Sequence, residues 1–513
     1  MYFRGLCYII QNNTVLGDEF MSADNRLSSG KKFAGVILGA LLCGFLWRVR
    51  GTHGFGSAWG LALVFACMTL LIFSFYGNRA KIKYELLPIG CISAFIATPA
   101  WGIVNGLAGG VLRGSLAGAD GEELETVING YHGLILLIMT GFALVCLYGI
   151  FVGTLFSPKE YKLYHYLIYA AVFLAAVYAA KLTFAHNLVK IIIPEAVREF
   201  SKGIADAGKD GGVRQVYLHY LFNAAGLKKI AYGRAYGESV EHIAFAFGAL
   251  ALILTSLVAF RDKITAFISF IINLFAAVGI TVSNVFLINS SHNPGNIIGS
   301  LRLPGFLSRT SWGMWEFFTG FFIGLGIMLV IALIPDKYTA GKHYKSESAI
   351  SNKIVRFVYN YLFTFGFALA AVPVRAAGLR LADTLEGAGV ISSERNELVS
   401  YIIIGVLGAA AAVLLFALLK KNILDKNLPV PVRKKPLDFA RLVLPGYTLL
   451  ILILFLIPDA EMLSLISSAK APAEFLQGLD RANIAAVISA VLFLAAFVTV
   501  KKRSVSNRRS VKR

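Results

Sequence analysis

The sequence predicts an all-α, polytopic integral membrane protein with about 12 transmembrane helices and both ends of the chain in the cytoplasm. Of its 513 residues, 57% are hydrophobic and 15% are charged, whereas soluble domains carry about a quarter of charged residues. Apolar stretches long enough to cross the hydrocarbon core of a bilayer recur along the chain. Lysine and arginine gather in alternate connections between them, which fixes the predicted orientation.

Each predicted span is an apolar segment of about 20 residues bounded by polar or glycine-rich sequence. The segment at 356–373 is short and rich in aromatic residues. The predicted spans are residues 33–49, 57–77, 87–108, 128–156, 165–185, 241–260, 264–288, 312–334, 356–373, 399–419, 438–457 and 483–500.

These spans divide the chain into tails, membrane segments and outer loops. The start at Met1 or at Met21 stays open, and the N-terminal segment lacks the basic-then-apolar layout of a signal peptide. The predicted divisions are a cytoplasmic N-terminal tail at 1–32, five spans within 33–185, an outer amphipathic loop at 186–240, seven spans within 241–500 with outer loops at 289–311 and 374–398, and a basic cytoplasmic tail at 501–513.

Charge supports this topology. The inner connections, such as 78–85, 261–263 and 420–436, all carry net positive charge, whereas the outer segment 119–125 is acidic. The formal net charge of +20 is therefore explained by cytoplasmic loops, and no nucleic-acid partner is expected. The compact loops favour a bacterial plasma (inner) membrane.

The sequence "GFLWRVRGTHGFGSAWG" (44–60) departs from this charge rule, because it places Arg48 and Arg50 on the predicted outer side. Three further outer stretches, at 98–114, 289–320 and 372–387, also concentrate arginine, tryptophan, histidine and glycine. Glycines there favour broken or re-entrant helices around an outward-facing pocket, with plain interfacial turns as the alternative. The candidate substrate-binding residues are Arg48, Arg50, Trp59, Trp101, Asn105, Arg113, His292, Arg302, Arg309, Trp312, Trp315 and Arg375.

Glu316 lies several residues into a predicted span, where an unpaired carboxylate costs several kcal/mol. The sequence predicts an arginine partner from the same side, such as Arg309 or Arg50. A helix-fixing ion pair without further role is the alternative to a functional carboxylate. His53 and Glu316 are the candidate catalytic residues, because an imidazole or a carboxylate can act as a base near neutral pH.

Guanidinium groups bind phosphate and carboxylate oxygens, so an anionic substrate is expected. We predict a transporter or flippase for a small anionic or lipid-linked substrate. The alternative is an integral-membrane glycosyl- or acyl-type transferase that acts at the outer face on a polyprenyl-phosphate-linked donor. The sequence contains no metal-binding or nucleotide-binding motif, so no metal and no cofactor is expected. Membrane lipids are expected partners, and the oligomeric state stays open.

Overall fold

The computed structural model describes residues 29–52, 57–76, 84–113, 115–117, 123–125, 128–292, 311–335, 350–419 and 491. The predicted spans 438–457 and 483–500, apart from residue 491, and both predicted cytoplasmic tails, apart from residues 29–32, lie outside these residues.

The described part of the chain is almost entirely helical, with one small hairpin whose two strands pair antiparallel. Short 3₁₀ or π-helical turns, labelled η, join several helices. The elements are α2 (Ser29–Thr52), α3 (Ser57–Tyr76), η3 (Tyr84–Leu86), α4 (Leu87–Ile103), η4 (Val104–Ala108), α5 (Gly109–Arg113), β1 (Ser115–Ala117), β2 (Glu123–Glu125), α6 (Gly130–Leu144), α7 (Cys146–Phe156), α8 (Leu163–Leu182), α9 (Ala185–Ile192), α10 (Pro194–Asp206), α11 (Val213–His219), α12 (Ala224–Lys228), α13 (Gly233–Leu254), η5 (Thr255–Ala259), α14 (Lys263–His292), α17 (Ser311–Leu333), α18 (Lys353–Tyr359), η8 (Asn360–Ala371), α19 (Val372–Gly387) and α20 (Ser393–Leu419).

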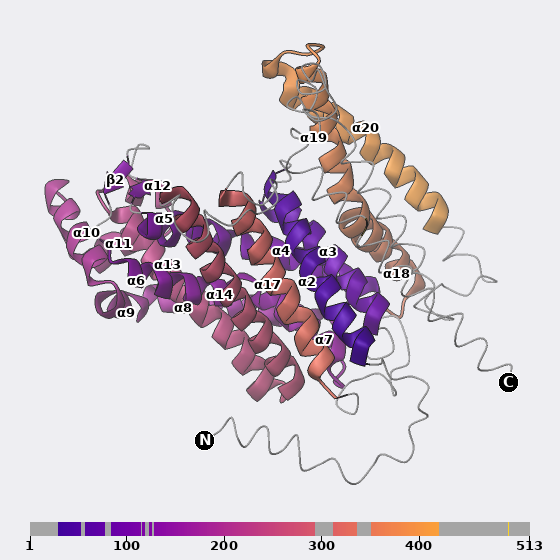
Figure 1. Ribbon diagram of the computed structural model, residues 1–513, viewed down its shortest axis with the longest axis horizontal. Coiled ribbons are helices and arrows are strands. Elements are labelled where there is room, and N and C mark those ends of the chain that lie inside the picture. Colours follow the sequence, from indigo (N-terminus) through magenta and orange to yellow (C-terminus); the bar gives the residue numbers. More distant parts are fainter. Residues whose placement is uncertain are drawn as a thin grey trace, which may run out of the picture.

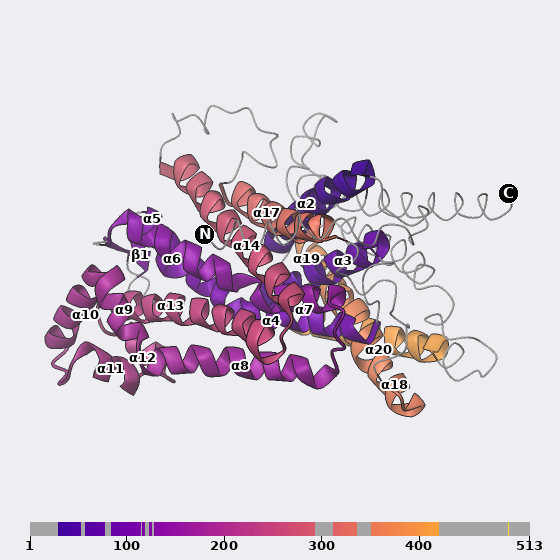
Figure 2. The same cartoon turned by 90° about the horizontal axis from the view of Figure 1, so that it is seen from below.

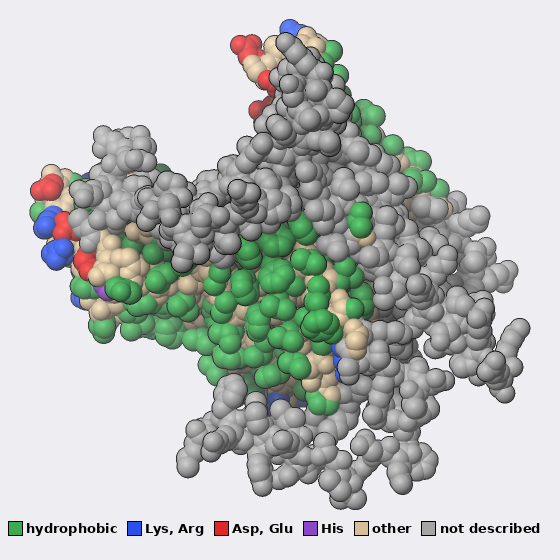
Figure 3. Space-filling view, viewed as in Figure 1, with side chains coloured by type: hydrophobic (Ala, Val, Ile, Leu, Met, Phe, Trp, Pro, Cys, Tyr) green, Lys and Arg blue, Asp and Glu red, His purple; other side chains and the backbone are tan. Residues whose placement is uncertain are grey.

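Six helices of the described residues are long and apolar enough to cross a membrane, or seven if one bent pair counts as a single span. The helical, membrane-type fold predicted from the sequence is thereby confirmed, while the number of twelve spans stays a prediction. The space-filling view shows a broad face of hydrophobic side chains over these helices, with charged groups gathered at the ends (Figure 3). The six are Leu163–Leu182, Gly233–Ala259, Lys263–Val285, Trp315–Leu333, Lys353–Gly387 and Ser393–Ala417.

The segment predicted as one span at 128–156 is two helices, α6 and α7, which meet at an angle of 42°. Val145 separates them with non-helical backbone angles. A glycine in each half lets it pack closely on α14, because a side chain on Gly141 would collide with the backbone of Ala277, and one on Gly149 would crowd Ser269. The bend thus lies between two close contacts with the same helix.

The span predicted at 356–373 is longer in the structure. Helices α18, η8 and α19 follow one another without a break, so the apolar helix runs from Lys353 to Gly387. Pro373, which the sequence places near the end of the span, lies inside this continuous helix, directly after the π-helical stretch η8. Helix therefore continues into the segment 374–398, which the sequence predicts as an outer loop with amphipathic character. Figure 1 shows α19 and α20 as a hairpin.

Helices α2 and α17 pack more extensively than any other pair of described elements, and both cartoon views show them side by side (Figures 1 and 2). Glycines bring the two backbones together. A Cβ at Gly320 would lie 2.5 Å from Cβ of Trp47, and one at Gly324 would lie 2.5 Å from Cβ of Cys43. The spacing of these glycines is the small-residue pattern that lets membrane helices approach closely.

The segment predicted as amphipathic at 186–240 folds into four short helices, α9 to α12, before α13 begins. We call α9 to α12 the cap layer. The cap layer lies between the candidate spans α8 and α13 in the sequence. Figure 1 shows it at the end of the bundle where α8 ends and α13 begins. His186 joins this layer to the bundle through both ring nitrogens: Nε2 lies 2.6 Å from the carbonyl oxygen of Lys181, and Nδ1 lies 2.8 Å from the Tyr236 hydroxyl.

A neutral His186 satisfies both of these contacts. A carbonyl only accepts, so Nε2–H donates to Lys181, and Nδ1 accepts from the Tyr236 hydroxyl. Burial lowers the pKa of His186 below its ordinary value of 6.5. The unfolded chain then binds more protons than the folded one as the pH falls through about 6.5.

We therefore expect the cap layer to lose stability as the pH falls below about 6.5, by at most about 1.4 kcal/mol per pH unit, the slope for one proton. Thermal unfolding of the purified protein between pH 5 and pH 8 measures this. His186→Gln retains a donor for Lys181 and removes the titration, so its stability should fall less on acidification. Parallel pH profiles of the two proteins would contradict the assignment.

Candidate functional site

A buried ion pair joins the two helices that pack most closely. Arg50, in the last turn of α2, approaches Glu316, in the first turns of α17. One terminal nitrogen of the guanidinium, Nη2, donates to both carboxylate oxygens at 2.6 Å. The side chains of Arg50 and Glu316 are 4% and 10% exposed. The sequence predicts Arg309 or Arg50 as the partner of Glu316, and pairing with Arg50 is confirmed.

An aromatic ring lies against this ion pair. Trp47 is almost completely buried, and the Arg50 guanidinium carbon lies 5.5 Å from the centre of its ring. A cation over an indole face is attracted by the ring quadrupole, more strongly when water is excluded. Burial also strengthens the attraction between guanidinium and carboxylate, and it raises the cost of separating them. The local environment therefore favours a state in which a negative group always lies beside the Arg50 guanidinium.

Gly60 provides the space for Arg50. A side chain at this position of α3 would collide with the Cβ and Cγ of Arg50, so the absence of a side chain lets the arginine stem lie against α3. The glycines in "RGTHGFGSAWG" thus include one whose role is packing around the arginine. The sequence predicts close backbone approach to a ligand there, and the structure places an arginine stem in that space.

A second cation–aromatic contact lies at the preceding residue of α3. The Arg375 guanidinium carbon, from α19, lies 5.6 Å from the centre of the Trp59 ring. Phe95 meets the same ring edge-on at a centroid distance of 5.4 Å. Because Trp59 and Gly60 are adjacent, the first turn of α3 contacts Arg50 with one residue and Arg375 with the next. Two of the four arginine-rich stretches, 44–60 and 372–387, therefore meet here. The stretch 289–320 joins them through Glu316, which pairs with Arg50.

The remaining predicted residues are placed less completely. Arg48 is buried on α2, one turn from the end of the helix. His53, Arg302 and Arg309 lie outside the described residues. Five others are placed by their backbone only: Trp101 on α4, Asn105 on η4, Arg113 at the end of α5, His292 at the end of α14 and Trp312 in the first turn of α17.

A second arginine–glutamate pair, which the sequence analysis does not single out, lies in the first turns of α13. Arg234 Nε donates to Glu238 Oε1 at 2.8 Å. The pair presses on Gly106 in the π-helical turn η4, because a Cβ there would lie 2.5 Å from Glu238 Oε2. The sequence carries no distinct signal for this pair, because Glu238 lies three residues before the predicted span at 241–260. The pair brings α13 against the remaining arginine-rich stretch, 98–114.

The histidines of the described bundle have structural partners. His242 is buried and its Nδ1 contacts the hydroxyl of Thr140, while Nδ1 of His132 lies 3.0 Å from a Glu195 oxygen. Within the described ranges, no three side chains of His, Cys, Asp or Glu come together as metal ligands would. The chemistry that these described side chains show is the pairing of guanidinium groups with carboxylates.

No protein-family model, no curated protein and no solved structure matches this chain.

Proposed function

We propose that this protein is a transporter or flippase for a phosphate- or carboxylate-bearing substrate, and that Arg50 is the residue that binds the anion. The observation that carries the proposal is the contact of Arg50 with both carboxylate oxygens of Glu316 at 2.6 Å between two different helices. Glu316 occupies the position that a substrate anion would take. The structure then corresponds to the substrate-free state.

The charges at the site favour a substrate anion that replaces the Glu316 carboxylate at Arg50 over an anion that binds in addition to it. A buried guanidinium that loses its counter-ion is destabilised by several kcal/mol. A substrate anion that replaces the Glu316 carboxylate keeps one negative group on Arg50 throughout, so the guanidinium is never left uncompensated. The released carboxylate stays under the positive charge of Arg48, which already acts on it. Release of Glu316 also removes the ion pair between α2 and α17, which couples substrate binding to the packing of the two helices that contact each other most extensively.

We infer the membrane location from the same observations. The ion pair lies at the end of α2 and the start of α17, and the positive-inside rule assigns this end of the bundle to the outer side of a plasma membrane, with both termini cytoplasmic. Arg234 and Glu238, at the start of α13, lie at the same end by chain direction. The anion would therefore enter from the outer side.

Competition between substrate and Glu316 makes a prediction with a definite sign. Glu316→Gln removes the competing charge and should strengthen anion binding by roughly tenfold, or about 1.4 kcal/mol. Arg50→Lys, which loses the planar fork of the guanidinium, should weaken it by a similar factor. Ligand-induced thermal shifts of the purified protein measure both, with inorganic phosphate, sugar phosphates, small organic acids and a polyprenyl phosphate as probes.

Lys353→Gln is the matched control, since it removes an exposed cation in the predicted inner segment at the start of α18. It should leave the shifts unchanged. Stabilisation by small soluble anions supports a transporter, and stabilisation by the polyprenyl phosphate supports a lipid-linked substrate. Weaker binding in Glu316→Gln, or undiminished binding in Arg50→Lys, would show that the anion does not compete for Arg50 and would overturn the proposal.

A further inference from the structure

A groove of about 680 Å³ lies on the cap layer, away from the Arg50–Glu316 pair. Its lining combines cationic and apolar residues from α9, α10 and α11. Ser201 adds a hydroxyl, and no acidic side chain lines it. The lining residues are Lys190, Pro194, Val197, Arg198, Ser201, Lys202, Ala205 and Val213.

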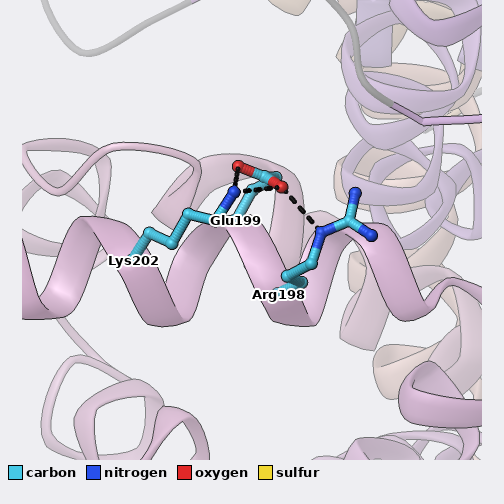
Figure 4. A network of polar contacts seen from close by, with 3 residues as sticks. All are labelled: Arg198, Glu199 and Lys202. Atoms are coloured by element: carbon cyan, nitrogen blue, oxygen red, sulfur yellow. Dashed lines mark hydrogen bonds and ion pairs between the residues drawn. The ribbon is translucent and has the colours of Figure 1, made fainter.

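The positive charge of the groove is only partly compensated. Arg198 Nε donates to Glu199 at 2.8 Å, and Lys202 Nζ contacts both oxygens of the same carboxylate at 3.0 Å. These hydrogen bonds lower the pKa of Glu199, so this carboxyl is ionised at neutral pH. One negative group thus serves two cations, and Lys190 adds a third. Figure 4 shows the two terminal nitrogens of Arg198 directed away from Glu199, where they can meet another anion.

The cap layer that carries the groove also exposes apolar side chains. Ile191, directly after Lys190, is 76% exposed, and Phe222 is 84% exposed. Phe222 stacks on Tyr178 of α8 with ring centroids 6.1 Å apart, so the exposed apolar side of α8 extends into the cap layer. Figure 3 shows charged side chains gathered at this end of the molecule, next to a hydrophobic face. Amphipathic helices of this composition lie at the boundary of headgroups and acyl chains.

We propose that this groove binds the headgroup of an anionic phospholipid, with its phosphate held by Lys190, Arg198 and Lys202 and the start of its acyl chains on the apolar floor at Val197. The three cations of the lining favour a phosphate, because guanidinium and ammonium groups form charge-assisted hydrogen bonds with its oxygens. The apolar floor and the neighbouring Ile191 favour a lipid over a free ion. The site is independent of anion exchange at Arg50.

The test uses the full-length protein in nanodiscs of phosphatidylcholine to which increasing fractions of phosphatidylglycerol are added. We expect the unfolding temperature to rise with phosphatidylglycerol. The triple variant Lys190→Gln, Arg198→Gln, Lys202→Gln should lose at least half of that rise. Lys209→Gln, Lys228→Gln, Lys229→Gln is the matched control, because it removes three exposed cations of the same segment that do not line the groove. It should keep the rise.

Two further measurements separate a lipid from a free anion and from a folding defect. Val197→Gln keeps every charge and changes the floor, so it should reduce the response to phosphatidylglycerol. Inorganic phosphate added to phosphatidylcholine nanodiscs should stabilise the wild-type protein less than phosphatidylglycerol does. Single Lys190→Gln should show a partial loss if the triple variant does not fold. Equal responses of the two triple variants, or equal stabilisation by inorganic phosphate, would overturn the proposal.

Discussion

Glu316→Leu is expected to lower the free energy of unfolding by about 3–5 kcal/mol, because it removes the carboxylate that Arg50 contacts at 2.6 Å in a buried position. The cost comes mainly from the guanidinium, which stays buried without this counter-charge. Unfolding of the purified protein in mixed detergent and sodium dodecyl sulfate, followed by tryptophan fluorescence, measures the change.

The double variant Arg50→Met, Glu316→Leu removes both charges and keeps apolar volume. Its stability should lie within about 1 kcal/mol of the wild type or above it, since a buried ion pair replaced by packed apolar residues is often neutral or stabilising. The same double variant should show no anion-induced stabilisation. Stability and ligand response together distinguish a structural ion pair from an anion-binding Arg50. If the pair only fixes the helices, a stable double variant keeps its ligand response. That result would contradict our proposal for Arg50.

Gly320→Ala is expected to cost about 1–3 kcal/mol, because the added methyl group would meet the backbone of Cys43 and lie 2.5 Å from Cβ of Trp47. The two helices must then move apart, and the Arg50–Glu316 pair lies one turn away. Thermal unfolding measures the loss of stability, and the ligand-induced shift measures the effect on the site.

Gly405→Ala on α20 is the matched control. A Cβ there meets nothing within 4 Å, and the position is exposed. The same substitution should leave stability unchanged or raise it by about 0.5–1 kcal/mol, the usual difference between alanine and glycine in a helix. A cost at Gly320 no larger than that at Gly405 would show that the close contact between α2 and α17 does not limit stability.

Helix positions are largely predictable from this sequence, because an apolar run of about 20 residues has few alternatives to a helix. Boundaries and bends are less predictable. The break at Val145 lies between Gly141 and Gly149, whose close contacts are with α14, at least 120 residues away in the chain, and such contacts leave no local signal. The helix Lys353–Gly387 continues through Pro373 directly after the π-helical stretch η8, which the sequence does not indicate.

The candidate site is predictable in part, for a physical reason. An intramembrane carboxylate requires a counter-charge, so the sequence limits the partner of Glu316 to a few arginines on the predicted outer side. The structure pairs Glu316 with Arg50. Glu238 is different, because it lies at the edge of its apolar segment, where a solvated carboxylate would look the same in the sequence. Its burial against Gly106 arises from the packing of η4 on α13. The four-residue spacing of Gly320 and Gly324 is present in the sequence, but it indicates a close helix contact only once the partner helix is known.

The Arg50–Glu316 contact also has a consequence for biosynthesis. The two residues are 266 positions apart in the chain, and ribosomes add about 5–20 residues per second, so Arg50 exists for roughly 13–50 s before Glu316 is made. During that interval Arg50 has no Glu316 carboxylate beside it, and a guanidinium is costly to bury without a counter-charge, so we expect it to stay within reach of water or lipid headgroups. Closure of this contact is therefore expected to be a late step of assembly.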